Sequence, residues 1–257
     1  MSAGKALARR PLITAHTGCE GTAENSLASI VSGIEAGADA VEIDVRATAD
    51  GVGILHHDPE IRVGTEECVR VADITLEELR SLEAWRNEAK GAQQAPVVLL
   101  DEALAVAREY ETIVNLDVKD DSGIRPIVRA VERYGLADKI VLSGCSAESA
   151  AAVTSADPGL RVLLNTETVD VRADDDEYRS FLLRTYHDAV HARCCGLNID
   201  YRMCREELVQ FAHERFLPVS VWTVNTADDM RRVIELDAFA ITTYEPRLLS
   251  EMLARRG

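Results

Sequence analysis

Short apolar segments alternate with amphipathic helical segments along the whole chain. The β-branched apolar segments that are expected to be strands lie at residues 11–16, 39–45, 112–118, 139–145, 160–165, 195–200, 218–224 and 238–244. Apolar residues at helical spacing lie between them, for example at 26–37, 124–135, 205–216 and 227–237. This alternation is typical of parallel strands joined by helical crossovers.

Eight such repeats in 257 residues match the size of a (β/α)8 barrel. The alternative is an open doubly wound sheet, which would need a glycine-rich phosphate turn after its first strand. The sequence HTGCEG at 16–21 is not G-x-G-x-x-G. We therefore predict an α/β chain that forms a single TIM-barrel domain over residues 1–257.

Two segments stand apart from the repeats. The connection at about 58–96 is too long for a barrel loop, so we predict a small cap-like insertion after the second strand. The acidic segment RADDDEY at 172–178 is expected to be a solvated loop.

Charge narrows the choice of partners. The chain has 44 acidic and 28 basic residues, a formal net charge of −16. Such a charge repels nucleic acid and anionic membranes, but a local cation still allows a small phosphorylated substrate. No apolar run reaches the roughly 18–20 residues of a membrane span, and no apolar signal segment follows the first basic residues.

The six cysteines lack C-x-x-C spacing. We expect free thiols in a reducing cytoplasm. The sequence leaves the oligomeric state open, a homo-oligomer included.

Polar residues interrupt the later parts of several predicted strands. Side chains two residues apart on a strand share a face. Glu42 therefore lies beside Asp44, and Asp117 lies beside Lys119, at the end of the barrel where catalytic groups gather. Carboxylates brought this close cannot all stay ionised without a counterion. An all-oxygen site of Glu42, Asp44 and Asp117 would suit Ca²⁺ or Mg²⁺.

Spacing alone leaves another interpretation open. The carboxylates of Glu42 and Asp44 could simply pair with Arg46, with Lys119 or with helix N-termini.

Histidines add candidate acid–base groups. His16 ends the first predicted strand, and His56 and His57 are neighbours that must face opposite ways, so only one of them can reach the mouth. Two imidazoles there could supply one base and one acid. A nucleophilic pair of Cys19 with His16 is the alternative, although nothing nearby marks the thiol as activated.

Other polar residues have simpler expected roles. His187, His191 and His213 fall on predicted helices and are expected at the surface or in packing. Glu24 and Asn25 are expected to cap a helix, with substrate contact as the alternative.

The segment AHTG at 15–18, followed by AEN, EIDV, DG and HHDP up to residue 59, resembles the opening of glycerophosphodiester phosphodiesterases. These enzymes belong to the phospholipase C-like phosphodiesterase barrels. Further similar segments are ITLEEL (74–79), NLDVK (115–119), VSVWTVN (219–225) and AFAITTYEP (238–246). The resemblance covers nearly the whole chain, although residues 143–205 match only in their strand–helix rhythm.

The resemblance implies a role for each matching residue. His16 and His57 correspond to general acid/base histidines, and Lys119 corresponds to a phosphate-contacting lysine. The carboxylates of Glu42, Asp44 and Asp117 correspond to the metal ligands, and Trp222 corresponds to a residue that lines the mouth.

The family's reaction, which belongs to lipid metabolism, uses Ca²⁺ or Mg²⁺ to hydrolyse a glycerophosphodiester to glycerol 3-phosphate and an alcohol. In its proposed route, a neighbouring hydroxyl of the substrate attacks phosphorus, and water opens the resulting cyclic phosphate.

Three positions depart from the family pattern. Thr17 stands where an arginine usually contacts the phosphate, so any substrate contact there lacks charge. Asp117 replaces a glutamate, and Thr243 replaces an aspartate before the final proline. The related sphingomyelinase D barrels share the aspartate and also lack the arginine, so the departures bear on glycerol-phosphate specificity more than on metal binding.

The first functional hypothesis is a metal-dependent glycerophosphodiester phosphodiesterase. The second is the same barrel acting on another phosphodiester, such as a sugar-linked one, or stopping at the cyclic phosphate as a lyase. The third is an inactive barrel that binds a phosphorylated ligand.

Overall fold

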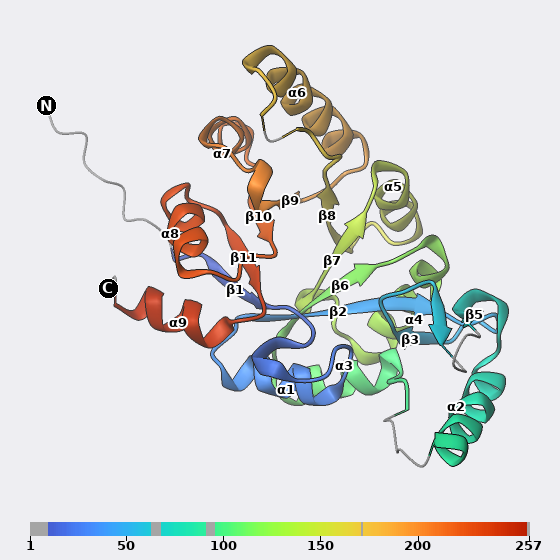
Figure 1. Ribbon diagram of the computed structural model, residues 1–257. Helices are drawn as coiled ribbons and strands as arrows, with labels where there is room; N and C mark the ends of the chain where they lie inside the picture. The colour runs from blue at the N-terminus through green and yellow to red at the C-terminus, as the bar shows by residue number, and fades with distance from the viewer. Residues whose placement is uncertain (1–9, 63–67, 91–95, 171, 256–257) are drawn as a thin grey trace, which may run out of the picture.

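A closed ring of parallel strands forms the centre of the molecule (Figure 1). The computed structural model describes residues 10–62, 68–90, 96–170 and 172–255. In ring order, the strands are β1 (Leu12–Ala15), β2 (Ala40–Ala47), β6 (Ile113–Val118), β7 (Ile140–Cys145), β8 (Arg161–Asn165), β9 (Gly196–Asp200), β10 (Val219–Trp222) and β11 (Ala240–Thr243). Strand β1 pairs with both β2 and β11, which closes the barrel. The predicted (β/α)8 fold is confirmed, and β2 runs two residues beyond its predicted end.

The helices surround this ring (Figure 1). They are α1 (Leu27–Glu35), α3 (Leu100–Glu109), α4 (Ile124–Tyr134), α5 (Ala147–Ala156), α6 (Asp175–His191), α7 (Glu206–His213), α8 (Ala227–Glu235) and α9 (Pro246–Ala254). Each helix packs on the barrel through an apolar face, as α4 illustrates. Its residues Ile124, Ile127 and Val131 recur at helical spacing and are all buried. It ends at Gly135, whose φ of 64° suits a residue without a Cβ atom.

Short 3-10 turns complete the described connections. They are η1 (Cys19–Gly21), η2 (Val71–Asp73), η3 (Asp121–Gly123), η4 (Ala137–Lys139) and η5 (Tyr201–Met203).

The long connection after β2 has a small core of its own. It contains β3 (Gly53–Leu55), which pairs antiparallel with β2, the hairpin of β4 (Glu60–Arg62) with β5 (Cys68–Arg70), and α2 (Leu76–Lys90). A separate cluster of buried apolar residues holds it together: Ile54, Ile61, Val71, Ile74 and Leu79. Figure 1 draws α2 outside the ring of barrel helices.

The expected acidic loop at 172–178 is a wrong prediction from Asp175 onward, and only residues 172–174 lie outside the helix. Helix α6 begins at Asp175, and the Asp174 side chain accepts a hydrogen bond from the Glu177 amide as its N-cap. Carboxylates are favourable at this end because of the helix dipole. Tyr178 is 2% exposed and anchors the first turn in the core.

Two smaller expectations can also be compared with the structure. In the described part of the chain, every helix is too short or too polar to cross a bilayer. All six cysteines are free thiols, as expected.

Candidate active site

A cavity of about 330 Å³ opens at the carboxyl ends of the barrel strands. Six predicted site residues line it: His16, Glu42, His57, Asp117, Lys119 and Trp222. Asp44 lies just beneath this surface, with 1% of its area exposed. Residues that are separated by more than 200 positions in sequence therefore share one pocket because the barrel closes.

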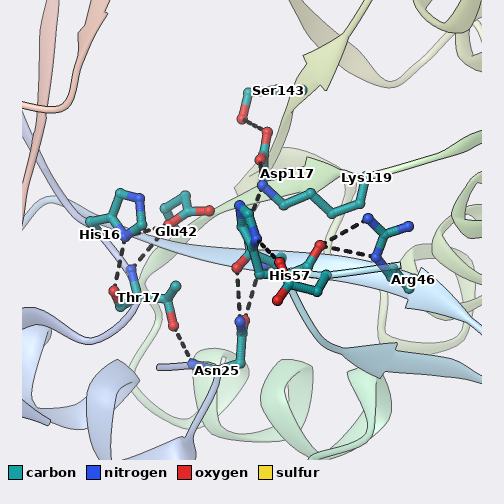
Figure 2. A network of polar contacts seen from close by, with 12 residues as sticks. His16, Thr17, Asn25, Glu42, Arg46, His57, Asp117, Lys119 and Ser143 are labelled. Carbon is teal, nitrogen blue, oxygen red and sulfur yellow. Dashed lines mark hydrogen bonds and ion pairs between the residues drawn. The ribbon is translucent and has the colours of Figure 1, made fainter. Parts of the chain in front are cut away.

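Three carboxylates converge at this cavity, and Figure 2 labels two of them, Glu42 and Asp117. Glu42, Asp44 and Asp117 each place one oxygen within 4.8 Å of the others. The register explains why, because Asp44 and Asp117 are direct partners on the neighbouring strands β2 and β6. Lys119 Nζ lies 2.8 Å from Asp44 Oδ1 and also forms an ion pair with Asp117. One ammonium cannot balance three carboxylates, so the group retains room for a divalent cation.

The pKa values reflect this imbalance. Burial raises the pKa of Glu42 well above its ordinary range, and the charges of Asp44 and Asp117 raise it further. Burial alone would also raise the pKa of Asp44, but the Lys119 ammonium and the Asn25 amide outweigh it and lower the pKa. The conflict between like charges therefore falls mainly on Glu42. A hard dication held by these oxygens would relieve it, so the residues fit Ca²⁺ or Mg²⁺.

Asn25 orients one of these carboxylates. Its Nδ2 donates to Asp44 Oδ2 at 2.7 Å, and its Oδ1 accepts from the Asp44 amide at 3.1 Å (Figure 2). The expected helix cap is instead the next residue, Ser26, whose side chain accepts from the Ser29 amide. Capping was therefore the wrong role for Asn25, which fixes the direction of a candidate metal ligand.

The two histidines that line the cavity are held by their Nδ1 atoms. His16 Nδ1 lies 2.8 Å from the Thr17 carbonyl oxygen, and its ring stacks on Tyr244 with centroids 4.3 Å apart. His57 Nδ1 lies 2.8 Å from Asp58 Oδ1. A proton on each Nδ1 would leave both Nε2 atoms for proton transfer. His56 contacts the Glu60 carbonyl instead, as the opposite-face argument predicts.

Thr17 does not line the cavity in this structure. It is 1% exposed. Its hydroxyl oxygen accepts a hydrogen bond from the backbone N–H of Asn25 at 2.5 Å, and its own backbone N–H donates to Glu42 Oε2 at 3.0 Å. Thr17 therefore contacts two residues of the site through its backbone and hydroxyl. Among the described residues that line the cavity, Lys119 is the sole lysine or arginine.

Two further expectations concern thiols and helical histidines. Cys19 is fully buried, and burial raises the pKa of its thiol, so it is not an activated nucleophile. His187, His191 and His213 lie on α6 and α7 and are exposed, away from the cavity.

The rest of the described cavity wall, called here the neutral wall, carries no charge. Trp222, Val118 and Gly144 belong to it, together with six neutral polar residues that were not predicted as site residues. They are Asn115, Ser143, Asn165, Asn198, Thr223 and Thr242. Ser143 donates to Asp117 Oδ1 at 3.0 Å, and Asn198 donates to Asn165 at 3.0 Å. Each except Thr223 lies within a barrel strand, where a polar residue is itself a signal of an inward-facing site.

The family model and the first of two relatives named below both point to the glycerophosphodiester phosphodiesterases. A model of the glycerophosphoryl diester phosphodiesterase family matches residues 9–248. The chain is 25% identical over 254 residues to a glycerophosphodiester phosphodiesterase of Caldanaerobacter subterraneus subsp. tengcongensis, covering 96% of this chain and 100% of that protein. It is 29% identical over 250 residues to an uncharacterized Bacillus subtilis protein, covering 94% of this chain and 98% of that one.

Solved structures share the fold. A putative glycerophosphoryl diester phosphodiesterase from Silicibacter pomeroyi superimposes with a TM-score of 0.78 at 21% identity, covering 96% of this chain and 94% of that one. An Oleispira antarctica phosphodiesterase in complex with the product sn-glycerol-3-phosphate gives 0.76 at 22% identity, with coverages of 95% and 97%. The family match spans nearly all of the barrel and every residue that lines the cavity. The chain therefore belongs to the glycerophosphoryl diester phosphodiesterase family and is a phosphoric diester hydrolase of that type.

Proposed function

We propose that the protein hydrolyses a glycerophosphodiester to glycerol 3-phosphate and an alcohol, with a divalent cation and with His16 and His57 as acid and base. One observation carries the proposal: three carboxylates on β2 and β6 and two imidazoles from the segments after β1 and β3 line or underlie one cavity beside a single lysine. The product complex of the Oleispira antarctica relative supports a substrate of this class.

The two imidazoles suit different steps. His57 Nδ1 lies 2.8 Å from Asp58 Oδ1, which orients the ring and leaves Nε2 to donate a proton, so we assign His57 as the general acid. His16 Nδ1 lies 2.8 Å from the Thr17 carbonyl oxygen and 3.5 Å from Glu42 Oε2, and we assign His16 as the base that accepts a proton at Nε2. In the first step, His16 takes the proton of the substrate's neighbouring hydroxyl as its oxygen bonds to phosphorus. The bond from phosphorus to the alcohol oxygen breaks, and His57 protonates that oxygen.

The second step reverses these roles. His57, now neutral, accepts a proton from the water that attacks the cyclic phosphate. His16 returns its proton to the ring oxygen as the ring opens, so both residues regain their first protonation states.

Glu42, Asp44 and Asp117 would hold the cation, and a bound Ca²⁺ or Mg²⁺ supplies positive charge to the phosphoryl oxygens. Lys119 forms ion pairs with Asp44 and Asp117, and we propose that its ammonium also contacts the phosphoryl group of the substrate. Trp222 and the rest of the neutral wall are proposed to contact the organic parts of the substrate, and Thr17 acts through Asn25 and Glu42.

The organisation of the chain is part of the proposal. We propose a single barrel domain in which residues 58–96 form a cap-like insertion. It begins directly after His57 and packs through its own core on Ile54. The cytoplasmic location and the role in lipid metabolism stay predictions.

A ³¹P NMR time course with glycerophosphocholine tests the reaction, in Ca²⁺, in Mg²⁺ and in chelator. Appearance of glycerol 3-phosphate only with metal is the expected result. A cyclic phosphate that persists would instead indicate the lyase, and turnover of another phosphodiester alone would indicate the second hypothesis. No turnover of any phosphodiester would contradict the proposal and favour a binding barrel.

A further inference from the structure

Arg46 is a buried cation next to the candidate site that none of the proposed steps uses. It lies on β2, two residues after Asp44, and is only 8% exposed. A buried guanidinium is costly unless its donors are satisfied. Its partners therefore indicate what the residue is for.

Two of its donors converge on one atom of the candidate acid. Arg46 Nε lies 3.0 Å and Nη2 lies 2.8 Å from the backbone carbonyl oxygen of His57 (Figure 2). Its Nη1 forms an ion pair with Asp120, in the turn after β6. Asp120 is fixed in turn, because its other oxygen accepts hydrogen bonds from the Ser122 amide at 3.0 Å and from the Ser122 hydroxyl.

His57 itself is weakly held. It lies beyond the end of β3, and its side chain is 59% exposed. Its imidazole contacts Asp58, whose side chain is 72% exposed. Within the described residues, Arg46 supplies every hydrogen bond that reaches the His57 backbone.

We propose that Arg46 is a positioning residue that fixes His57 relative to the carboxylates. Its guanidinium joins β2, which carries Glu42 and Asp44, to the turn that follows Asp117 and to the His57 carbonyl. The inference rests on the proposed function, which makes His57 the general acid. Arg46 does not line the cavity, so it acts through His57 and not on the substrate.

The shape of arginine matters here. Its planar fork can donate to a carbonyl and to a carboxylate at the same time, which one lysine ammonium does less well. Displacement of a catalytic group by about 1 Å can cost about 10²-fold in rate. Loss of Arg46 should therefore lower the rate of the chemical step more than substrate or metal binding.

The test uses Arg46→Met and Arg46→Lys, with Arg133→Met as the control. Arg133 forms an exposed ion pair with Asp101, away from the cavity. We expect Arg46→Met to lower kcat about 10- to 100-fold while KM and Ca²⁺ affinity stay within about twofold. Arg46→Lys should recover part of kcat, and the control should retain all of it.

A second measurement does not depend on activity. In ¹H–¹⁵N spectra of the histidine side chains, Arg46→Met should shift or broaden the His57 signals, assigned by their loss in His57→Ala, and leave the His16 signals unchanged. If the Arg46 variants do not fold, Asp120→Asn loosens the same guanidinium and should produce a smaller change of the same kind.

The outcomes separate the inference from the function on which it rests. An inactive His57→Ala together with normal kcat and unchanged His57 signals in Arg46→Met would overturn the positioning role alone. A parallel loss of kcat, Ca²⁺ affinity and all histidine signals in Asp120→Asn as well as in Arg46→Met would also overturn it, because these contacts would then maintain the fold and not the position of His57. Normal activity of His57→Ala would refute the proposed function first.

Discussion

The two halves of the barrel mouth differ sharply in charge. Every ionisable side chain that lines the cavity comes from β2, from β6 or from the segments that follow β1, β3 and β6: His16, Glu42, His57, Asp117 and Lys119. The strands from β7 round to β11, with the residue that follows β10, contribute neutral groups: Ser143, Gly144, Asn165, Asn198, Trp222, Thr223 and Thr242. One sector can therefore stabilise charge and transfer protons. The other can only form hydrogen bonds with the substrate or pack against it.

This division suggests that chemistry and recognition depend on different residues. The strand register fixes the positions of charged side chains on adjacent strands, as it does for the register partners Asp44 and Asp117. The part of the neutral wall on β7 to β11 lies outside the charged strands and can vary without disturbing that arrangement. Changes in the charged sector should affect the rate on every substrate, whereas changes in the neutral wall should affect the choice among substrates.

The largest expected effect is loss of the carboxylate cluster. Asp44→Asn, or removal of divalent cations by chelation, should lower the rate by at least about 10³-fold, because several kcal/mol of charge stabilisation at phosphorus disappear. Activity assays with added Ca²⁺ or Mg²⁺, together with calorimetric Ca²⁺ titration, measure both parts. Asp101→Asn, at an exposed ion pair, is the matched control. Full activity of Asp44→Asn in chelator would remove the metal from the proposal.

Next come the two imidazoles. His16→Ala and His57→Ala should each lose at least about 10²-fold in kcat, because each removes one proton-transfer group, and both variants should stay folded. Steady-state kinetics and circular dichroism check the two statements. His213→Ala, on the exposed face of α7, should behave as the parent protein. Near-normal kcat in either site variant would refute that residue's role.

The sequence predicted the charged sector better than the neutral one. Alternation along a strand placed Glu42 beside Asp44 and Asp117 beside Lys119, because the two-residue repeat is a local property. Closure of the barrel then explains why separate strands meet. All eight barrel strands were predicted for the same reason, since β-branched runs and helical periods are also local.

What was missed depends on contacts between distant segments. Asn25 was expected to cap a helix, but its amide faces Asp44 across 19 positions of sequence. The acidic segment before Tyr178 was expected to be a loop, but α6 begins within it at Asp175, and Tyr178 in its first turn is buried. Neither the partner of a polar side chain nor the burial of a single aromatic residue can be derived from a local pattern.

A smaller effect should appear in the pH dependence of stability. Because the pKa of Glu42 is raised in the metal-free fold, its stabilising protonated form is fully present below the ordinary value of 4.5 and is lost as pH rises through the raised value. Ca²⁺ binding requires the carboxylate, so metal affinity should increase over the same range.

Thermal unfolding with and without Ca²⁺ at several pH values measures this effect. The increase in Tm caused by Ca²⁺ should be larger at pH 8 than at pH 6, and Glu42→Gln should reduce the pH dependence of the metal-free Tm. An equal increase in Tm at both pH values would be evidence against Glu42 as a ligand that exchanges its proton for the metal.

The smallest effect should come from the neutral wall, and it distinguishes the two sectors most directly. Trp222 lies at the mouth and is 37% exposed, so its ring face is available to a substrate group without touching the phosphorus. A quaternary ammonium over an indole is worth about 0.5–1 kcal/mol at an exposed site, which corresponds to a change of about two- to fivefold. Trp222→Leu should therefore raise KM for glycerophosphocholine by that amount, with kcat nearly unchanged, and have less effect on glycerophosphoglycerol. His57→Ala should lower kcat for both substrates by the same factor. If Trp222→Leu instead lowers kcat equally for both, the neutral wall takes part in the chemistry, and the division between the two halves of the mouth does not hold.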